Sequence, residues 1–121
     1  MADATTWTVE WYTLRGGRVP LGIYLDSLPE TDRKRAFALL TLLAARGNQL
    51  REPHSKVVEP GLMELRGGGS NQVRMFYIFR PGRRAVVLDG ILKKQDAIPR
   101  DVLERMRAYR RDVEAREQKA Q

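Results

Sequence analysis

The segment from Gly61 to Lys94 limits the possible folds more than any other part of this chain. Three runs rich in leucine, β-branched and aromatic residues predict strands at Leu62–Arg66, Val73–Arg80 and Arg84–Leu92. Between the second and third runs, Pro81 fixes φ for the first corner of a tight turn and Gly82 accepts a positive φ at the second. The pattern predicts three consecutive antiparallel strands.

The middle run carries apolar side chains at both odd and even positions, which lie on opposite faces of a strand. The two sets are Val73, Met75, Tyr77 and Phe79 on one face, and Phe76 and Ile78 on the other. Strands buried on both faces have such near-continuous apolar runs. We therefore expect this strand to lie in the middle of the sheet.

The other elements follow from the spacing of apolar residues. Alternation predicts a strand over Thr6–Tyr12, and residues 48–60, with two prolines, are expected to form a loop. Spacings of three and four residues predict helices at Val19–Leu28, at Pro29–Arg46 and from Arg100 to about Arg116. The polar end of the chain, 116–121, is expected to fray.

The predicted order of elements is β-α-α-β-β-β-α, and the predicted fold class is α+β. Two helices joined by so short a connection should form a hairpin across the sheet. We expect a small sandwich in which this helical hairpin packs on a four-stranded, mainly antiparallel sheet. Residues 1–121 are long enough for one domain with a real core and too short for two.

Positive charge is concentrated in the strand block. The formal net charge is +7; residues 61–98 hold seven Lys and Arg against three Asp and Glu, whereas residues 1–45 hold five of each. The cations of the block lie near the strand ends: Arg66, Arg74, Arg80, Arg83, Arg84, Lys93 and Lys94. Apolar strands with cations at their ends favour a polyanionic ligand, with RNA as the first candidate.

Several kinds of chemistry are excluded or disfavoured by composition. The absence of cysteine excludes disulfides, thiolate zinc sites and a cysteine nucleophile. The single histidine, without HExxH or paired-aspartate spacing, predicts neither a metal site nor a cofactor. No secretory signal and no apolar run of about 20 residues is present, so a cytoplasmic protein is expected.

Metal-free RNA cleavage needs an activated 2′-OH, stabilisation of charge on the pentavalent phosphorus, and protonation of the leaving 5′-oxygen. Arginine suits the second task, because its guanidinium is always charged and binds phosphate oxygens in pairs. Arg66 and Arg74 can lie close together if the strand register is regular. The alternatives for this pair are an ion pair with Glu64 or a solvated sheet edge.

Three stretches of the sequence carry a family resemblance. EPHSKVVEPGLMELR, VRMFYIF and GILKKQDAIP, at these separations, resemble the phage-derived HigB-like branch of the RelE/ParE toxin superfamily over residues 20–113. Met63 stands where the family usually has tryptophan, and GGGSN lengthens a hairpin tip. The resemblance implies a type II toxin that cuts mRNA, usually in the ribosomal A site. It also implies an antitoxin, often with a helix-turn-helix domain, through which alone the toxin would reach operator DNA.

The resemblance also implies roles for individual residues. Basic motif positions match Arg66, Arg74, Lys93 and Lys94, and the aromatic position matches Tyr77, which makes these the candidate catalytic residues. A buried core position is the alternative for Tyr77, and a solvated strand end is the alternative for the lysine pair. The candidate RNA-binding residues are His54, Lys56, Arg83 and Arg84.

Two other functions fit the same predicted fold. A ParE-like toxin would bind and poison DNA gyrase without cutting RNA. A phage-derived module could bind nucleic acid through its cationic sheet and have no toxicity.

Overall fold

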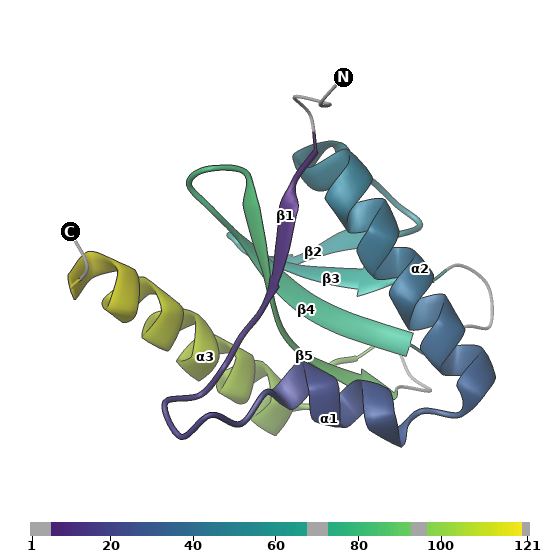
Figure 1. Cartoon of the computed structure of the whole chain (residues 1–121), viewed down its shortest axis with the longest axis horizontal. Helices are drawn as coiled ribbons and strands as arrows, with labels where there is room; N and C mark the ends of the chain where they lie inside the picture. Colours follow the sequence, from purple (N-terminus) through teal and green to yellow (C-terminus); the bar gives the residue numbers. More distant parts are fainter. Residues whose placement is uncertain (1–5, 68–72, 93–96, 120–121) are drawn as a thin grey trace.

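The computed structural model describes residues 6–67, 73–92 and 97–119, and Figure 1 shows the course of the chain. The five strands are β1 Thr8–Trp11, β2 Ser55–Glu59, β3 Leu62–Arg66, β4 Val73–Arg80 and β5 Arg84–Leu92. The helices are α1 Pro20–Ser27, α2 Glu30–Arg46 and α3 Arg100–Lys119, with a short 3-10 helix, η1, at Gly47–Gln49. Of the helices in these described ranges, none is long and apolar enough to cross a membrane.

One mixed sheet contains all five strands in the order β1-β5-β4-β3-β2. β1 runs parallel to β5, and the other three neighbouring pairs are antiparallel. The α+β class and the mainly antiparallel sheet are therefore confirmed. The predicted number of four strands is wrong, because β2 forms inside the expected loop 48–60.

The sequence analysis did not predict β2, because β2 is a short strand at the edge of the sheet. Its middle residues Lys56 and Val57 are exposed, so the sequence shows no apolar alternation there. The strand exists because it pairs with β3, from Ser55 opposite Leu65 to Glu59 opposite Leu62, with one register shift. Pairing of this kind depends on the partner strand more than on local propensity.

Helices cover both faces of the sheet, as Figure 1 shows. α1 and α2 form the predicted helical hairpin and bury Leu21, Leu25, Leu40 and Leu43 with one side of the sheet. α3 packs on the other side through Val102, Met106, Tyr109 and Val113. We call these two sides the hairpin face and the α3 face.

The alternation predicted for β4 is confirmed. Val73, Met75 and Tyr77 belong to the core of the hairpin face, whereas Phe76 and Ile78 belong to the core of the α3 face. β4 lies between β5 and β3, so it is the central strand that the sequence predicts.

The hairpin between β4 and β5 turns at the predicted place, and both strands have the predicted bounds. Arg80 pairs with Arg84, which leaves a loop of Pro81, Gly82 and Arg83. Gly82 has φ 88° and Arg83 has φ 56°. Arg83 thus occupies the left-handed region that side chains other than glycine and asparagine rarely adopt.

α3 continues to Lys119, so residues 116–119 of the tail that was expected to fray are helical. Arg116 donates from Nη1 to the Thr13 carbonyl at 2.7 Å, and Glu117 accepts hydrogen bonds from Arg80 and Arg84. These contacts tie the last turns of the helix to distant parts of the chain.

Candidate functional site

Arg66 and Arg74 lie directly opposite each other on β3 and β4. Their neighbours Leu65 and Met75 point into the hairpin-face core, so alternation directs both arginines to the α3 face. The prediction that a regular register brings the two together is confirmed. Two like charges in this position need a compensating anion.

Glu64 supplies a compensating anion from the same face of β3. Its Oε1 lies 3.8 Å from Nη1 of Arg66 and 3.9 Å from Nε of Arg74. Glu64 is 3% exposed and Arg74 is 8% exposed, whereas the Arg66 side chain is 26% exposed. A buried carboxylate is costly unless cations and hydrogen bonds surround it. Glu64, Arg66 and Arg74 therefore form one unit, which we call the Glu64 cluster.

β2 brings two further predicted residues next to this cluster. Lys56 is opposite Glu64 in the β2–β3 register and is exposed. The backbone carbonyl of His54 accepts a hydrogen bond of 2.8 Å from the N–H of Arg66. The sequence suggested both residues as RNA contacts, but it gave no reason for their position, because the strand that places them was not predicted.

Tyr77 does not join the Glu64 cluster, and its predicted catalytic role is corrected. It is 1% exposed in the hairpin-face core, where its hydroxyl shares a hydrogen bond with Oγ of Ser55. Burial raises the pKa of the Tyr77 hydroxyl. The physical reason is strand alternation: residues 74 and 77 are separated by an odd number, so their side chains face opposite sides of the sheet.

Lys93 and Lys94 lie outside the described residues, as does most of the GGGSN tip. The described part of the candidate site consists of the Glu64 cluster with His54 and Lys56 beside it.

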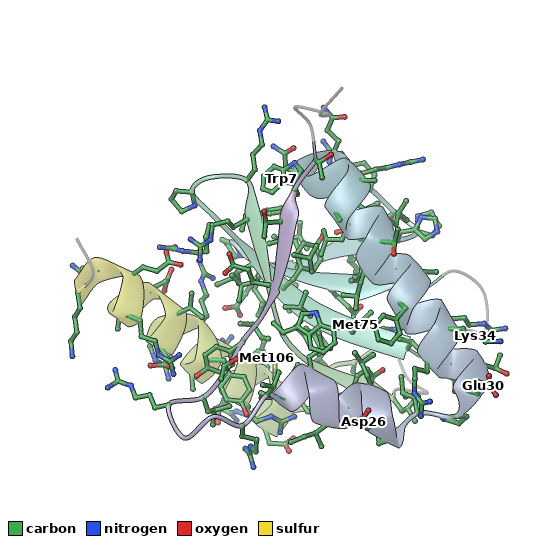
Figure 2. The ribbon with its side chains drawn as sticks, viewed as in Figure 1. Trp7, Asp26, Glu30, Lys34, Met75 and Met106 are labelled. Atoms are coloured by element: carbon green, nitrogen blue, oxygen red, sulfur yellow. The ribbon has the colours of Figure 1, made fainter. Side chains whose placement is uncertain are left out.

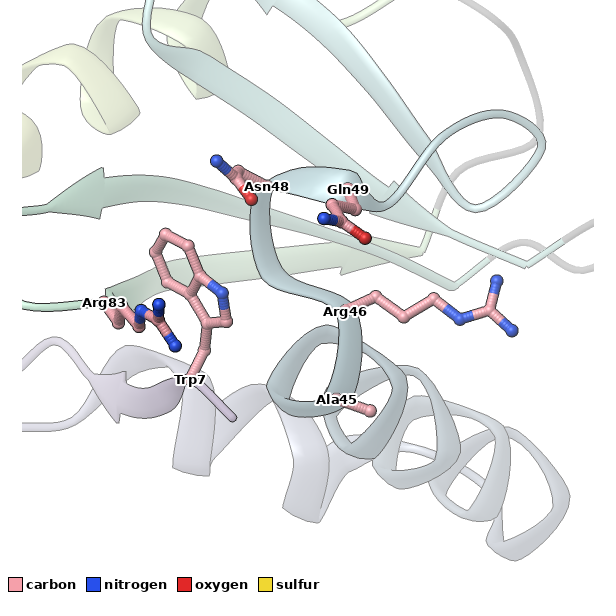
Figure 3. Close-up of a pocket in the computed structure, with 6 residues that line it drawn as sticks. All are labelled: Trp7, Ala45, Arg46, Asn48, Gln49 and Arg83. Atoms are coloured by element: carbon pink, nitrogen blue, oxygen red, sulfur yellow. The ribbon is translucent and has the colours of Figure 1, made fainter. Parts of the chain in front are cut away.

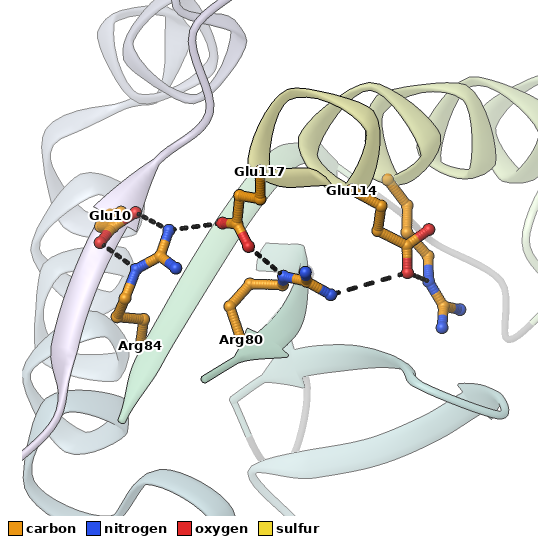
Figure 4. Close-up of polar contacts among 6 residues, drawn as sticks. Glu10, Arg80, Arg84, Glu114 and Glu117 are labelled. Carbon is orange, nitrogen blue, oxygen red and sulfur yellow. Dashed lines mark hydrogen bonds and ion pairs between the residues drawn. The ribbon is translucent and has the colours of Figure 1, made fainter. Parts of the chain in front are cut away.

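Arg84, which the sequence analysis predicts as an RNA contact, forms ion pairs with two carboxylates of the protein. It donates to Glu10 from Nε at 2.7 Å and from Nη2 at 3.0 Å, and to Glu117 at 2.7 Å (Figure 4). These hydrogen bonds, first those to Glu10, raise the pKa of the Arg84 guanidinium. Arg80 completes the network through Glu117 at 2.8 Å and Glu114 at 3.8 Å.

Arg83 differs from Arg80 and Arg84 in its surroundings. It is exposed and lines a pocket with Trp7 at the end of the sheet where the β4–β5 loop lies. The Glu64 cluster is built at the opposite end of β4, where that strand begins. The predicted RNA-binding residues are thus divided between two places.

Asp89 is a charged residue that the sequence analysis did not single out. It lies opposite Phe76 on β5, while Arg74 is opposite Ile91, so Asp89 and Arg74 are diagonal neighbours on the α3 face. Burial raises the pKa of the Asp89 carboxyl, and Arg105 lies 3.5 Å from its Oδ2. The only signal in the sequence was one acidic residue inside an apolar run.

The geometry suits an oxyanion better than a metal. The partly exposed guanidinium of Arg66 can bind two oxygens of one phosphate, while Arg74 adds positive charge from below. Across residues 6–67, 73–92 and 97–119, no three His, Asp or Glu side chains are grouped closely enough to hold a metal ion.

Comparisons with known proteins give one finding about the family. The family model described as Phage derived protein Gp49-like (DUF891) matches residues 23–111, from within α1 into α3. The matched range includes every residue of the Glu64 cluster. No curated protein matches the chain.

Proposed function

Because the chain belongs to the Gp49-like family of phage-derived proteins, a family associated with RelE-type toxins, we propose that it is the toxin of a type II toxin–antitoxin system. We propose further that it is a metal-independent endoribonuclease that cuts mRNA on the ribosome. The observation that carries the proposal is the Glu64 cluster, where two facing arginines share a buried carboxylate.

In the proposed reaction the 2′-oxygen of the RNA attacks the adjacent phosphorus and loses its proton to a base. The bond from phosphorus to the 5′-oxygen breaks, and that oxygen takes up a proton, leaving a 2′,3′-cyclic phosphate and a free 5′-OH. Arg66 binds the non-bridging oxygens, where negative charge increases in the transition state. Removing one such donor typically lowers the rate by about 100-fold or more.

Glu64 and Arg74 position this group. Arg74 is largely buried, so its part is to fix the electrostatic field rather than to make the first contact with RNA. Glu64 contacts both arginines and thereby restricts the orientation of the Arg66 guanidinium. Fixed donors need no reorganisation at the moment of reaction, which is the source of their catalytic value.

Proton transfer is assigned to residues around the cluster. His54 is joined to Arg66 through the backbone, and histidine is the residue type most often used as general acid or base. Lys56, across from Glu64, is proposed to hold the RNA backbone. Lys93 and Lys94, outside the described residues, are proposed for the same backbone contact or for proton transfer.

The proposed partners are mRNA, the ribosome and a cognate antitoxin of the helix-turn-helix type, all in the cytoplasm. The net charge of +7 favours association with ribosomal RNA. The antitoxin would neutralise the toxin by covering the exposed side of the Glu64 cluster. Operator DNA would be reached only through the antitoxin.

Brief induction in bacterial cells, followed by mapping of transcript ends, tests the proposal. Wild type should stop growth and produce new mRNA ends within coding sequences, and Arg66→Ala should do neither. Arg111→Ala, which removes the same charge from an exposed position on α3, should behave as wild type. Arrest with intact mRNA and an induced DNA-damage response would instead identify a gyrase inhibitor. Normal growth with the wild-type chain would identify a non-toxic nucleic-acid-binding module.

A further inference from the structure

A polar pocket of about 430 Å³ lies at the end of the sheet away from the Glu64 cluster. Trp7, Ala45, Arg46, Asn48, Gln49 and Arg83 line it. Figure 3 shows the indole between Arg83 and the loop that carries Asn48 and Gln49, with Arg46 extending outward from the end of α2. Three segments far apart in the sequence therefore meet here, and the proposed cleavage reaction uses none of these residues.

The wall of the pocket is firmly built around Trp7. Its backbone N–H donates to the Ala44 carbonyl at 2.8 Å, and its ring lies 4.9 Å from that of Phe79 between centroids. Gly47, at φ 51°, lies so close to the indole that a Cβ there would overlap it. A position that needs both a positive φ and close approach can hold only glycine without displacement. The indole is thus fixed in place.

The charges in this pocket are uncompensated, unlike those beside it. Arg80 and Arg84 form ion pairs with glutamates, but the Arg83 side chain between them in sequence makes no ion pair or hydrogen bond within the described structure. Within the described residues, the Arg46 side chain likewise makes no ion pair or hydrogen bond. Among residues 6–67, 73–92 and 97–119, Arg83 is also the only non-glycine residue with a positive φ. Such conformations are concentrated at functional sites.

We propose that this pocket binds one nucleotide of a single-stranded RNA. Arg83 would contact the phosphate and Arg46 an adjacent one, because unpaired guanidinium groups are strong phosphate ligands. Asn48 and Gln49 each offer a donor and an acceptor, which match base edges, and the indole offers an aromatic surface. An acidic peptide would need the cations but not the carboxamides, so RNA fits the residues better. The inference does not depend on cleavage at the Glu64 cluster.

The chain offers a built-in probe, because Trp7 and Trp11 are its two tryptophans. In a Trp11→Phe protein, Trp7 is the only indole. The ligand is an eight-nucleotide RNA with 2′-O-methyl groups, which cannot be cleaved by attack of a 2′-OH. We expect a saturable change in Trp7 emission and a matching change in the anisotropy of the labelled RNA.

Two substitutions in the Trp11→Phe background define the site. Arg83→Asn removes the charge but tolerates the left-handed backbone, so it should fold and should weaken RNA binding about tenfold. Arg111→Ala, with the same loss of charge on α3, should weaken binding less than twofold. Circular dichroism verifies that both proteins are folded. Equal weakening by the two variants, or unchanged Trp7 emission at saturating RNA, would overturn the proposal.

A further pair of measurements separates this site from the proposed nuclease and from a protein partner. Arg66→Ala should abolish cleavage in cells while the emission change of Trp7 persists, so either result can fail alone. If Arg83→Asn left RNA binding intact but abolished binding of the antitoxin, the pocket would be a protein-binding site and the proposal would be wrong.

Discussion

Each end of β4 carries an arginine that lies opposite an arginine of a neighbouring strand, and the two pairs differ in their surroundings. Arg80 faces Arg84 where β4 ends, and Arg66 faces Arg74 where it begins. The first pair donates hydrogen bonds of 2.7–3.0 Å to Glu10 and Glu117 (Figure 4). The second pair lies 3.8 and 3.9 Å from Glu64. The same residue type therefore serves cohesion at one end and, in our proposal, phosphate binding at the other.

The origin of the carboxylates explains the difference. Glu10 and Glu117 come from β1 and α3, so the arginines at the end of β4 tie three elements together. Glu64 lies two residues from Arg66 on the same strand, and it also contacts Arg74 on the neighbouring strand β4. Figure 2 labels Met75 on the sheet and Met106 on α3, which belong to the cores of the hairpin face and the α3 face. The partly exposed Arg66, whose anion lies on its own strand, keeps its charge available to a ligand.

The largest expected effect comes from removing the charge of the shared carboxylate. Glu64→Gln keeps the shape but leaves the two arginines without that anion, so the free energy of unfolding should fall by about 3 kcal/mol. Urea denaturation measures the fall, and toxicity should disappear with it. Glu114→Gln, a partly exposed partner of Arg80 at 3.8 Å, is the control and should lose less than about 1 kcal/mol. Equal losses in the two variants would remove the contrast between the two ends.

Arg66→Ala should separate activity from stability. The side chain is partly exposed and makes one long ion pair, so the free energy of unfolding should change by less than about 1 kcal/mol. Cleavage of mRNA should fall by about 100-fold, because a transition-state donor is lost. Primer extension on transcripts from induced cells gives the second quantity. Activity within threefold of wild type would show that Arg66 does not bind the scissile phosphate.

Arg84→Ala should show the opposite separation. It removes two hydrogen bonds to Glu10 and one to Glu117, so thermal and urea unfolding should reveal a loss of about 1.5 kcal/mol. Growth arrest on induction should persist, because Arg84, on β5, lies opposite the end of β4, whereas the Glu64 cluster lies where β4 begins. A fully stable protein that has lost toxicity would reverse the roles of the two arginine pairs.

The smallest expected effect is a pH dependence of the stability that Glu117 contributes at the Arg80–Arg84 end of β4. The hydrogen bond from Arg84, followed by that from Arg80, lowers the pKa of Glu117 below 4.5. The stability that Glu117 contributes is therefore complete above the ordinary pKa of a glutamate and is lost as pH falls through the lowered value. The difference in unfolding free energy between wild type and Glu117→Gln should be about 1 kcal/mol at pH 7 and should shrink in acid. A difference that stays constant with pH would contradict this linkage.

Local pattern was sufficient for the centre of the fold. The alternation in β4 fixed which residues face each helical layer, and regular pairing of β3 with β4 then placed Arg66 opposite Arg74. The same alternation already separated Tyr77 from Arg74, and a strict use of it would have removed Tyr77 from the candidate site. Period-two geometry is a property of the backbone, so it can be read from a single segment.

What the sequence alone determined is the set of elements with strong apolar periodicity, and with it the α+β class, the helical hairpin and the facing arginines of the candidate site. Tertiary structure decided the rest: the edge strand β2 beside His54 and Lys56, the full length of α3, and the internal use of Arg84. Each of these depends on a partner that local sequence does not specify, such as Glu10, 74 residues from Arg84. The sequence gives only the number and positions of the charged residues. Whether an arginine contacts a carboxylate or solvent is decided when distant segments pack together.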